Sequence, residues 1–81
     1  LSRHFSHDKN SLLKAKQLYE ESIALNPNYI NANYNLAMLL MNYFADDNNS
    51  LLKAKQLFEN VLQSNPNHIN SINNLKKPAF A

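Results

Sequence analysis

The chain has 81 residues, a formal net charge of +2, and neither glycine nor cysteine. Without glycine it lacks the glycine-rich phosphate loops of nucleotide-binding sites, and without cysteine it has no disulfide or thiolate metal site. No apolar run approaches the roughly 20 residues needed to span a bilayer, and no signal peptide follows Leu1. We therefore expect an intracellular, cytoplasmic protein of one small domain, without membrane insertion.

One stretch of the sequence occurs nearly twice, so that the copy beginning at Ser11 begins again at Ser50. Residues 10–31 and 49–70 form 22 aligned pairs, of which 15 are identical. A period between about 20 and 50 residues is the signature of a solenoid or a similar repeat array. The duplication therefore indicates one structural unit made again, whereas a catalytic site needs its residues only once.

The first copy predicts a helix that starts near Ser11 and ends before Pro27. Its side chains recur at helical spacing and form one stripe that is apolar except for the serine: Leu12, Ala15, Tyr19, Ser22 and Ile23, with Leu18 beside them. The sequence NPN at residues 26–28 ends the helix, because proline lacks the amide that would continue it and disfavours helical angles in the residue before it.

Three further helices are predicted along the chain. Residues 29–45 have a broad apolar face, and the second copy predicts a helix from Ser50 to just before Pro66. The polar run DDNNS at residues 46–50 can accept hydrogen bonds from the free amides of that helix's first turn. A last helix is predicted to begin near His68 and to end just before Pro78.

These segments resemble a tetratricopeptide repeat, whose pattern is W-x2-L-G-x2-Y, then A-x3-F, then P. The complete copy reads Asn33-x2-Leu36-Ala37-x2-Leu40, then Ala54-x3-Phe58, then Pro66. The partial copies supply Ala15-x3-Tyr19 and Pro27 before it, and Ile72-x2-Leu75-Lys76 after it. The resemblance covers nearly the whole chain and implies an all-α fold, an α-solenoid of antiparallel helix pairs with a 39-residue period.

Two features depart from the family pattern. Asn33 stands where the family has an aromatic residue, and the period is longer than the family's, with five additional positions between Ala37 and Ala54. Sel1-like repeats also have an insertion there and a KA pair like Lys53-Ala54. They usually carry glycines as well, and this chain has none. Both families imply the same helix-pair architecture, and the tetratricopeptide pattern matches better.

The resemblance divides the chain into three segments of a longer array. Residues 1–28 hold the end of one A helix and the B helix of a partial repeat. Residues 29–67 form one complete repeat, and residues 68–81 start a third, which ends near Pro78. Because about three repeats are usually needed for stability, we expect further repeats beyond both ends or support from a large assembly.

The function implied by the resemblance is a protein–protein interaction scaffold, without enzymatic activity or cofactor. Stacked helix pairs present a concave face, built mainly from the A helices, to a peptide or to another subunit of a complex. On this face the resemblance places the candidate partner-binding residues: Asn31, Tyr34, Asn35, Met38, Asn42, Asn70, Asn74 and Lys77. An asparagine amide both donates and accepts, which suits a peptide backbone. The same asparagines suit a solvated surface equally well.

Other functions stay open as alternatives. An RNA-binding helical repeat would need a basic face, but the lysines alternate with acidic residues and the net charge is only +2. A repeat module appended to an enzyme elsewhere in a longer chain is a second alternative, and no constellation of catalytic residues occurs in this sequence. The carboxylate clamp of some family members needs basic residues where this chain has Asn70 and Asn74.

A metal site is a weaker candidate. His4, His7 and Asp8 form the pattern H-x2-H-D, in which two histidines three residues apart could share an ion. No third strong ligand follows nearby, so we expect a polar segment there and no bound metal.

Overall fold

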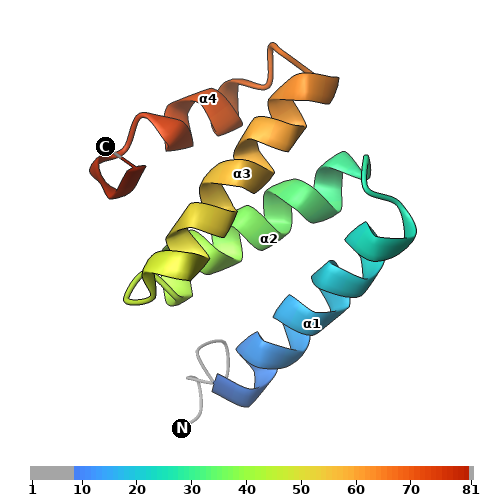
Figure 1. Cartoon of the computed structure of the whole chain (residues 1–81), viewed down its shortest axis with the longest axis vertical. Coiled ribbons are helices and arrows are strands. Elements are labelled where there is room, and N and C mark those ends of the chain that lie inside the picture. Colours follow the sequence, from blue (N-terminus) through green and yellow to red (C-terminus); the bar gives the residue numbers. More distant parts are fainter. Residues whose placement is uncertain (1–8, 81) are drawn as a thin grey trace, which may run out of the picture.

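The computed structural model describes residues 9–80, and these residues form four α-helices and one short 3-10 helix, with no strand among them (Figure 1). The helices are α1 (Lys9–Leu25), α2 (Ile30–Tyr43), α3 (Asn48–Ser64), α4 (Ile69–Leu75) and the 3-10 helix η2 (Pro78–Phe80). The prediction of an all-α fold class is confirmed for this part of the chain. The last α-helix ends before Pro78, as the sequence predicts.

The boundaries of the helices recur with the offset seen in the sequence. The first residues of α1 and α3 are 39 positions apart, as are their last residues and the first residues of α2 and α4. The turns recur as well. The amide of Asn26 donates to the Ser22 carbonyl at 2.9 Å, and that of Tyr29 donates to the Asn26 carbonyl at 3.0 Å. In the second NPN turn, Asn65 and His68 make the corresponding bonds at 2.8 and 3.0 Å.

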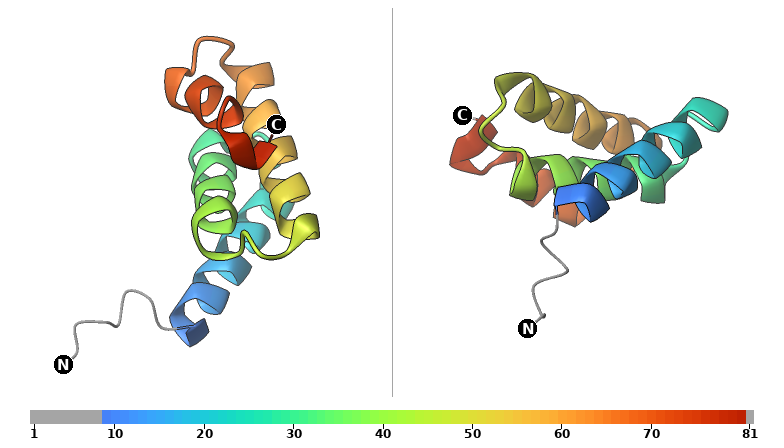
Figure 2. Two further views of the ribbon diagram at one scale, coloured as in Figure 1. Left: turned by 90° about the vertical axis from the view of Figure 1, so that its left-hand side faces the viewer. Right: turned by 90° about the horizontal axis from the view of Figure 1, so that it is seen from below.

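Each short turn reverses the chain, so that consecutive helices pack side by side. α2 lies between α1 and α3, and α3 lies between α2 and α4 (Figure 1). Seen from below, α2 and α4 both lie on the same side of α3 (Figure 2). The two helices that begin at corresponding positions of the duplication therefore share one side of the molecule.

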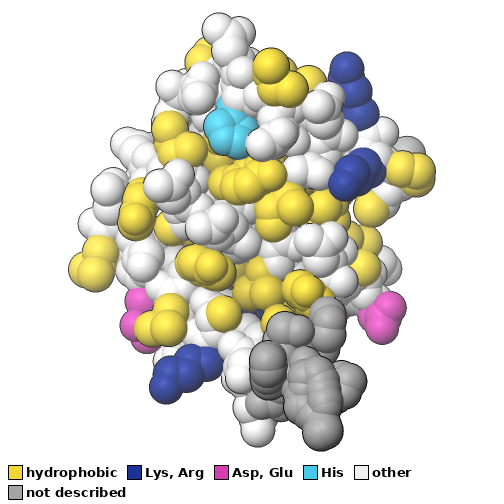
Figure 3. All heavy atoms as spheres, turned by 180° about the vertical axis from the view of Figure 1, so that it is seen from behind, with side chains coloured by type: hydrophobic (Ala, Val, Ile, Leu, Met, Phe, Trp, Pro, Cys, Tyr) yellow, Lys and Arg dark blue, Asp and Glu magenta, His cyan; other side chains and the backbone are white. Residues whose placement is uncertain are grey.

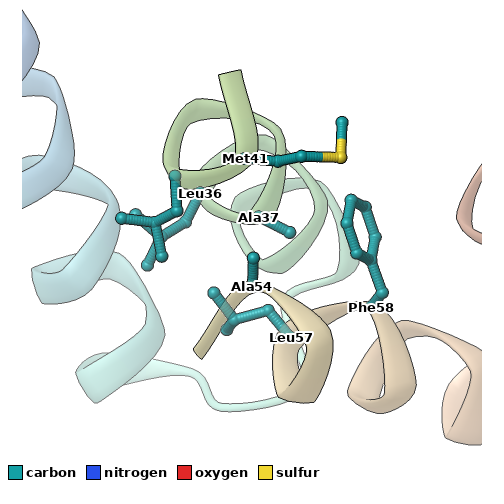
Figure 4. Packing of buried hydrophobic residues seen from close by; sticks show 7 residues of the cluster. Leu36, Ala37, Met41, Ala54, Leu57 and Phe58 are labelled. Carbon is teal, nitrogen blue, oxygen red and sulfur yellow. The ribbon is translucent and has the colours of Figure 1, made fainter. Parts of the chain in front are cut away.

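The hydrophobic core lies between α2 and α3. Its buried cluster combines four residues of α2 with three of α3: Leu36, Ala37, Leu40, Met41, Ala54, Leu57 and Phe58. Figure 4 shows Ala37 and Ala54 facing each other between the two helices, with Phe58 beside Met41. Both alanines are completely buried, so a larger side chain at either place would push the helices apart.

The start of α3 is held by its capping residue. Asp47 has an extended backbone, and its carboxylate accepts hydrogen bonds from the Asn49 amide and from the Ser50 hydroxyl, both at 3.0 Å. These bonds satisfy a free donor of the first helical turn and fix the buried Ser50 side chain. The polar run before the second copy therefore begins the helix in the way that the sequence predicts.

The two copies differ in burial although their sequences are nearly the same. α3 is covered by helices on two sides and buries five of its side chains, whereas α1 contains no buried residue. Leu18 keeps 53% of its surface exposed, and Leu57, its counterpart in the second copy, keeps 5%. The difference arises from the neighbours of each helix, because the side chains are identical.

Candidate partner-binding face

The face predicted to bind a partner is formed by α2 and α4. On α2, the side chains of Asn31, Asn35 and Asn42 are exposed, and those of Tyr34 and Met38 are half-buried. These five residues therefore line the exposed part of the helix and the border of the core.

The positions predicted on and just after α4 differ in their solvent exposure. Asn70, in the first turn of α4, and Lys77, just after the helix, are exposed. Asn74 is buried, with 6% of its surface exposed, so the expectation that its side chain faces outward is wrong. Its counterpart Asn35 is exposed, and the two asparagines are therefore not equivalent in this structure.

Asn74 is buried because its amide reaches across to α2. The Nδ2 group of Asn74 donates to the sulfur of Met38 at a distance of 3.2 Å, which joins two predicted site residues that are 36 positions apart. A thioether is a weak acceptor, so the bond orients the amide more than it stabilises it. The contact brings the middle of α2 next to the end of α4.

Four ring side chains also pack against one another between these helices, each in contact with the next. Tyr34 packs against His68 with ring centres 5.0 Å apart and against the edge of Phe58 at 5.9 Å. Phe58 in turn makes an edge-to-face contact with Phe80 at 6.0 Å. Such pairs are worth about 0.5–1.5 kcal/mol beyond the area that they bury. The row ties α2, α3, α4 and η2 together.

His68 and Phe80 were not recognised as part of this face from the sequence. His68 aligns with Tyr29 directly after an NPN turn, which marks it only as the residue before a helix. Phe80 follows Pro78, where the helical pattern ends, and nothing local indicates that η2 folds back onto α3. Its aromatic side chain was the one available signal of burial.

His68 also caps the last α-helix. Its Nδ1 atom accepts a hydrogen bond from the Ser71 amide at 3.2 Å and lies 2.9 Å from the Ser71 hydroxyl. Because Nδ1 accepts from an N–H group, the imidazole proton belongs on Nε2. Tyr29, at the same place before α2, makes no side-chain cap. The imidazole thus both caps the first turn of α4 and packs on Tyr34.

The surface of this face is apolar in the middle and polar around it. Seen from behind, hydrophobic side chains gather below a histidine side chain, and basic and acidic side chains lie at the edges (Figure 3). The remaining area belongs to other side chains and to the backbone. Such a surface suits a ligand with apolar side chains and an uncharged polar backbone.

Asn33, which departs from the family pattern, lies buried at the start of α2. Its Nδ2 group donates to the carbonyl of Pro27 at 3.1 Å and to that of Tyr29 at 2.8 Å. Its Oδ1 atom is buried without a partner. The amide therefore holds the first NPN turn against α2, a structural task that an aromatic ring could not perform.

The candidates for other functions gain little from the structure. Lys16 lies over the ring of Phe44, 5.2 Å from its centre, so one of the five lysines of α1 and α3 packs against protein. Residues 9–80 hold no group of three or more His, Cys, Asp or Glu side chains placed to bind a metal ion. The H-x2-H-D segment lies outside the described residues.

Within the described part of the chain, no helix is sufficiently long and apolar to cross a membrane.

A scan against protein-family models and searches of the curated proteins and of the solved structures found no match for this chain. Its function is therefore inferred from its own residues and their geometry.

Proposed function

We propose that this chain is a segment of a tetratricopeptide-like helical-repeat scaffold, which presents the face formed by α2 and α4 to a peptide or to a neighbouring protein subunit. The scaffold acts inside the cell, and the lack of cysteine agrees with a reducing compartment. Its mechanism is shape complementarity over a large surface, without bond chemistry.

One observation carries the proposal: the two helices that begin at corresponding positions of the duplication lie on the same side of α3 and touch each other. The bond from Asn74 to Met38 and the packing of His68 on Tyr34 join α2 to α4 along this side. A stack of helix pairs forms a binding face only when its A helices align in this way. The recurring helix boundaries and NPN turns support the same arrangement.

The chemistry of the face favours an extended peptide. The exposed amides of Asn31, Asn35 and Asn42 can donate to carbonyls and accept from N–H groups, so they match a peptide backbone without reading its side chains. The half-buried side chains of Tyr34 and Met38 offer apolar contact beside them. A ligand with spaced apolar side chains and few charges fits both.

The proposal is tested by selecting peptides from a random displayed library on the 81-residue chain and mapping the selected peptides by amide chemical shifts. We expect shifts to concentrate on α2 and α4, and Asn35→Ala to weaken binding about threefold or more, as loss of one hydrogen bond would. Asn60→Ala, an exposed asparagine of α3, is the matched control and should leave affinity unchanged. Shifts centred on the outer side of α3, or equal loss with both variants, would contradict the proposal.

A further inference from the structure

The first turn of α4 depends on a titratable side chain that acts as a hydrogen-bond acceptor. The Nδ1 atom of His68 accepts from the Ser71 amide at 3.2 Å and lies 2.9 Å from the Ser71 hydroxyl. Ser71 is completely buried, so water cannot replace the imidazole as the partner of its amide. Only a ring whose Nδ1 atom carries no proton can accept this bond. The start of α4 is therefore tied to the protonation state of one histidine.

α4 is a short helix and relies on this cap more than α2 relies on its own first residue. α4 has seven residues, whereas α2, which begins at the corresponding position of the duplication, has 14. Helices shorter than about 12 residues are marginal in water, so their ends and their packing decide whether they form. Tyr29 stands before α2 without making a side-chain cap. The longer helix thus forms without the device that the shorter one has.

A proton on Nδ1 would act against this cap in two ways. It removes the acceptor of the Ser71 amide, because both nitrogens of a charged imidazole are donors. It also places a positive charge at the N-terminus of a helix, where the helix dipole opposes it. The charged ring can donate to the Ser71 hydroxyl, but that bond leaves the buried amide without an acceptor. The cap is therefore stable with a neutral ring and weakened with a charged one.

No nearby charge compensates for protonation of the ring. Within residues 9–80, the imidazole interacts with Ser71 of α4 and with the phenol of Tyr34 on α2, a group that is neutral in acidic solution. α2 and α4 contain no charged residue. The charged residues of α3 and of the segment after α4 are Lys53, Lys55, Glu59, Lys76 and Lys77. In this part of the chain the carboxylate of Glu59 forms no ion pair with His68. Protonation therefore weakens the cap without creating a salt bridge in its place.

The same ring connects α4 to the candidate partner-binding face. It packs on Tyr34 with ring centres 5.0 Å apart, and Asn74, near the other end of α4, donates to the sulfur of Met38 at 3.2 Å. α4 spans about two turns, so fraying that starts at its first turn reaches both contacts. The position of α4 against α2 therefore depends on the cap.

We propose that His68 is a pH-sensitive switch: its neutral imidazole holds α4 against α2, and its protonation in mildly acidic solution loosens α4 and disrupts the face formed by the two helices. Histidine is the side chain whose charge ordinarily changes between about pH 5 and pH 8, so the switch acts in this range. The switch itself needs no bound partner. Only its consequence, weaker binding of a peptide in mildly acidic solution, rests on the proposed function.

The experiment compares the 81-residue chain with its His68→Asn variant at about pH 7.5 and about pH 5, on either side of the usual range of histidine. Asparagine keeps a capping acceptor that does not titrate, and His4 and His7 are present in both proteins, so their protonation cancels in the comparison. NMR measures hydrogen exchange of the Ser71 amide, divided by the rate of an unstructured peptide at the same pH. We expect this protection to fall at least about fivefold on acidification of the parent chain and less than about twofold in the variant, as loss of one cap predicts.

Two further signals test the mechanism. The methyl group of Met38 reports the contact with Asn74 and should shift on acidification in the parent chain only, whereas the methyl groups of Leu36, which is completely buried, are the matched control and should stay unchanged in both proteins. Nitrogen NMR of the parent chain should find the imidazole proton on Nε2 at about pH 7.5, and this measurement does not require the variant to fold.

The proposal is overturned if protection changes equally in both proteins, if the parent chain keeps its protection at about pH 5, or if the neutral ring carries its proton on Nδ1. None of these measurements uses a ligand, so they judge the switch whether or not the face binds a peptide. A selected peptide that binds equally at both pH values while α4 frays would contradict the proposed binding face and leave the switch supported.

Discussion

Truncating one leucine in each copy compares the same side chain in two environments. We consider Leu57→Ala on α3 and Leu18→Ala on α1, which occupy the same place in the duplication. Leu57 belongs to the cluster between α2 and α3 and is 5% exposed, whereas Leu18 is 53% exposed. If burial against neighbouring helices determines how much each leucine stabilises the fold, the two substitutions should differ strongly in their effect on the free energy of unfolding.

The expected magnitudes follow from burial. Truncating a core leucine to alanine costs about 2–5 kcal/mol, because the transfer free energy is lost and a cavity remains. For Leu57 we expect about 3 kcal/mol. Leu18 has about half of its surface in water and would leave no closed cavity, so we expect about 1 kcal/mol or less. Globular domains of this length are typically stable by about 4–12 kcal/mol, and a chain with fewer than three repeats is expected to lie at the low end of that range, so Leu57→Ala would remove a large part of its stability.

The assay is urea unfolding followed by far-ultraviolet circular dichroism. With a slope of about 1 kcal/mol per molar urea for a small domain, a difference of about 2 kcal/mol separates the two midpoints by about 2 M. The corresponding difference in Tm is about 8–16 °C. Equal midpoints for the two variants at equal slopes, or a greater loss with Leu18→Ala, would refute the reasoning that packing against α2 stabilises α3 more than α1.

Two further substitutions test polar contacts. His68→Ala removes the acceptor for the Ser71 amide and should lower the free energy of unfolding by about 1 kcal/mol, whereas His68→Asn keeps a capping acceptor and should retain most of the stability. Hydrogen exchange of the Ser71 amide checks this, because it should become faster only in the alanine variant. Equal exchange in both variants would contradict the prediction. Asn33→Ala removes the bonds to the Pro27 and Tyr29 carbonyls and should cost about 1–3 kcal/mol in a urea titration. A stabilised Asn33→Ala protein would show that the unpartnered Oδ1 atom costs more than the two bonds contribute.

The helices were predictable because their signals are local. The apolar stripes, the capping run before α3 and the two NPN turns each act within a few residues, and the helices begin and end close to where these signals place them. α2 is shorter than the segment 29–45, since Tyr29 serves as its N-cap and the chain leaves helical geometry at Phe44. Cap geometry of this kind is decided by backbone angles that composition does not reveal.

The candidate face was predictable only in part, because its contacts join residues far apart in the chain. Resemblance places Asn74 outward, yet its amide turns toward Met38, 36 residues away. The packing of His68 on Tyr34 and of Phe80 on Phe58 likewise depends on where α4 and η2 lie relative to α2 and α3. Local patterns predict which segments become helices, and they carry little information on which side chains meet.

The pairs that differ between the two copies limit how far α1 can repeat the packing of α3. Residues 10–18 are identical to residues 49–57, but all five pairs between residues 21–25 and 60–64 differ. At one of these pairs the buried Val61 of α3 is replaced in α1 by the smaller, polar Ser22. Val61 contributes apolar contact at its place in α3, whereas the Ser22 hydroxyl would need a hydrogen-bond partner if it were buried in the same way.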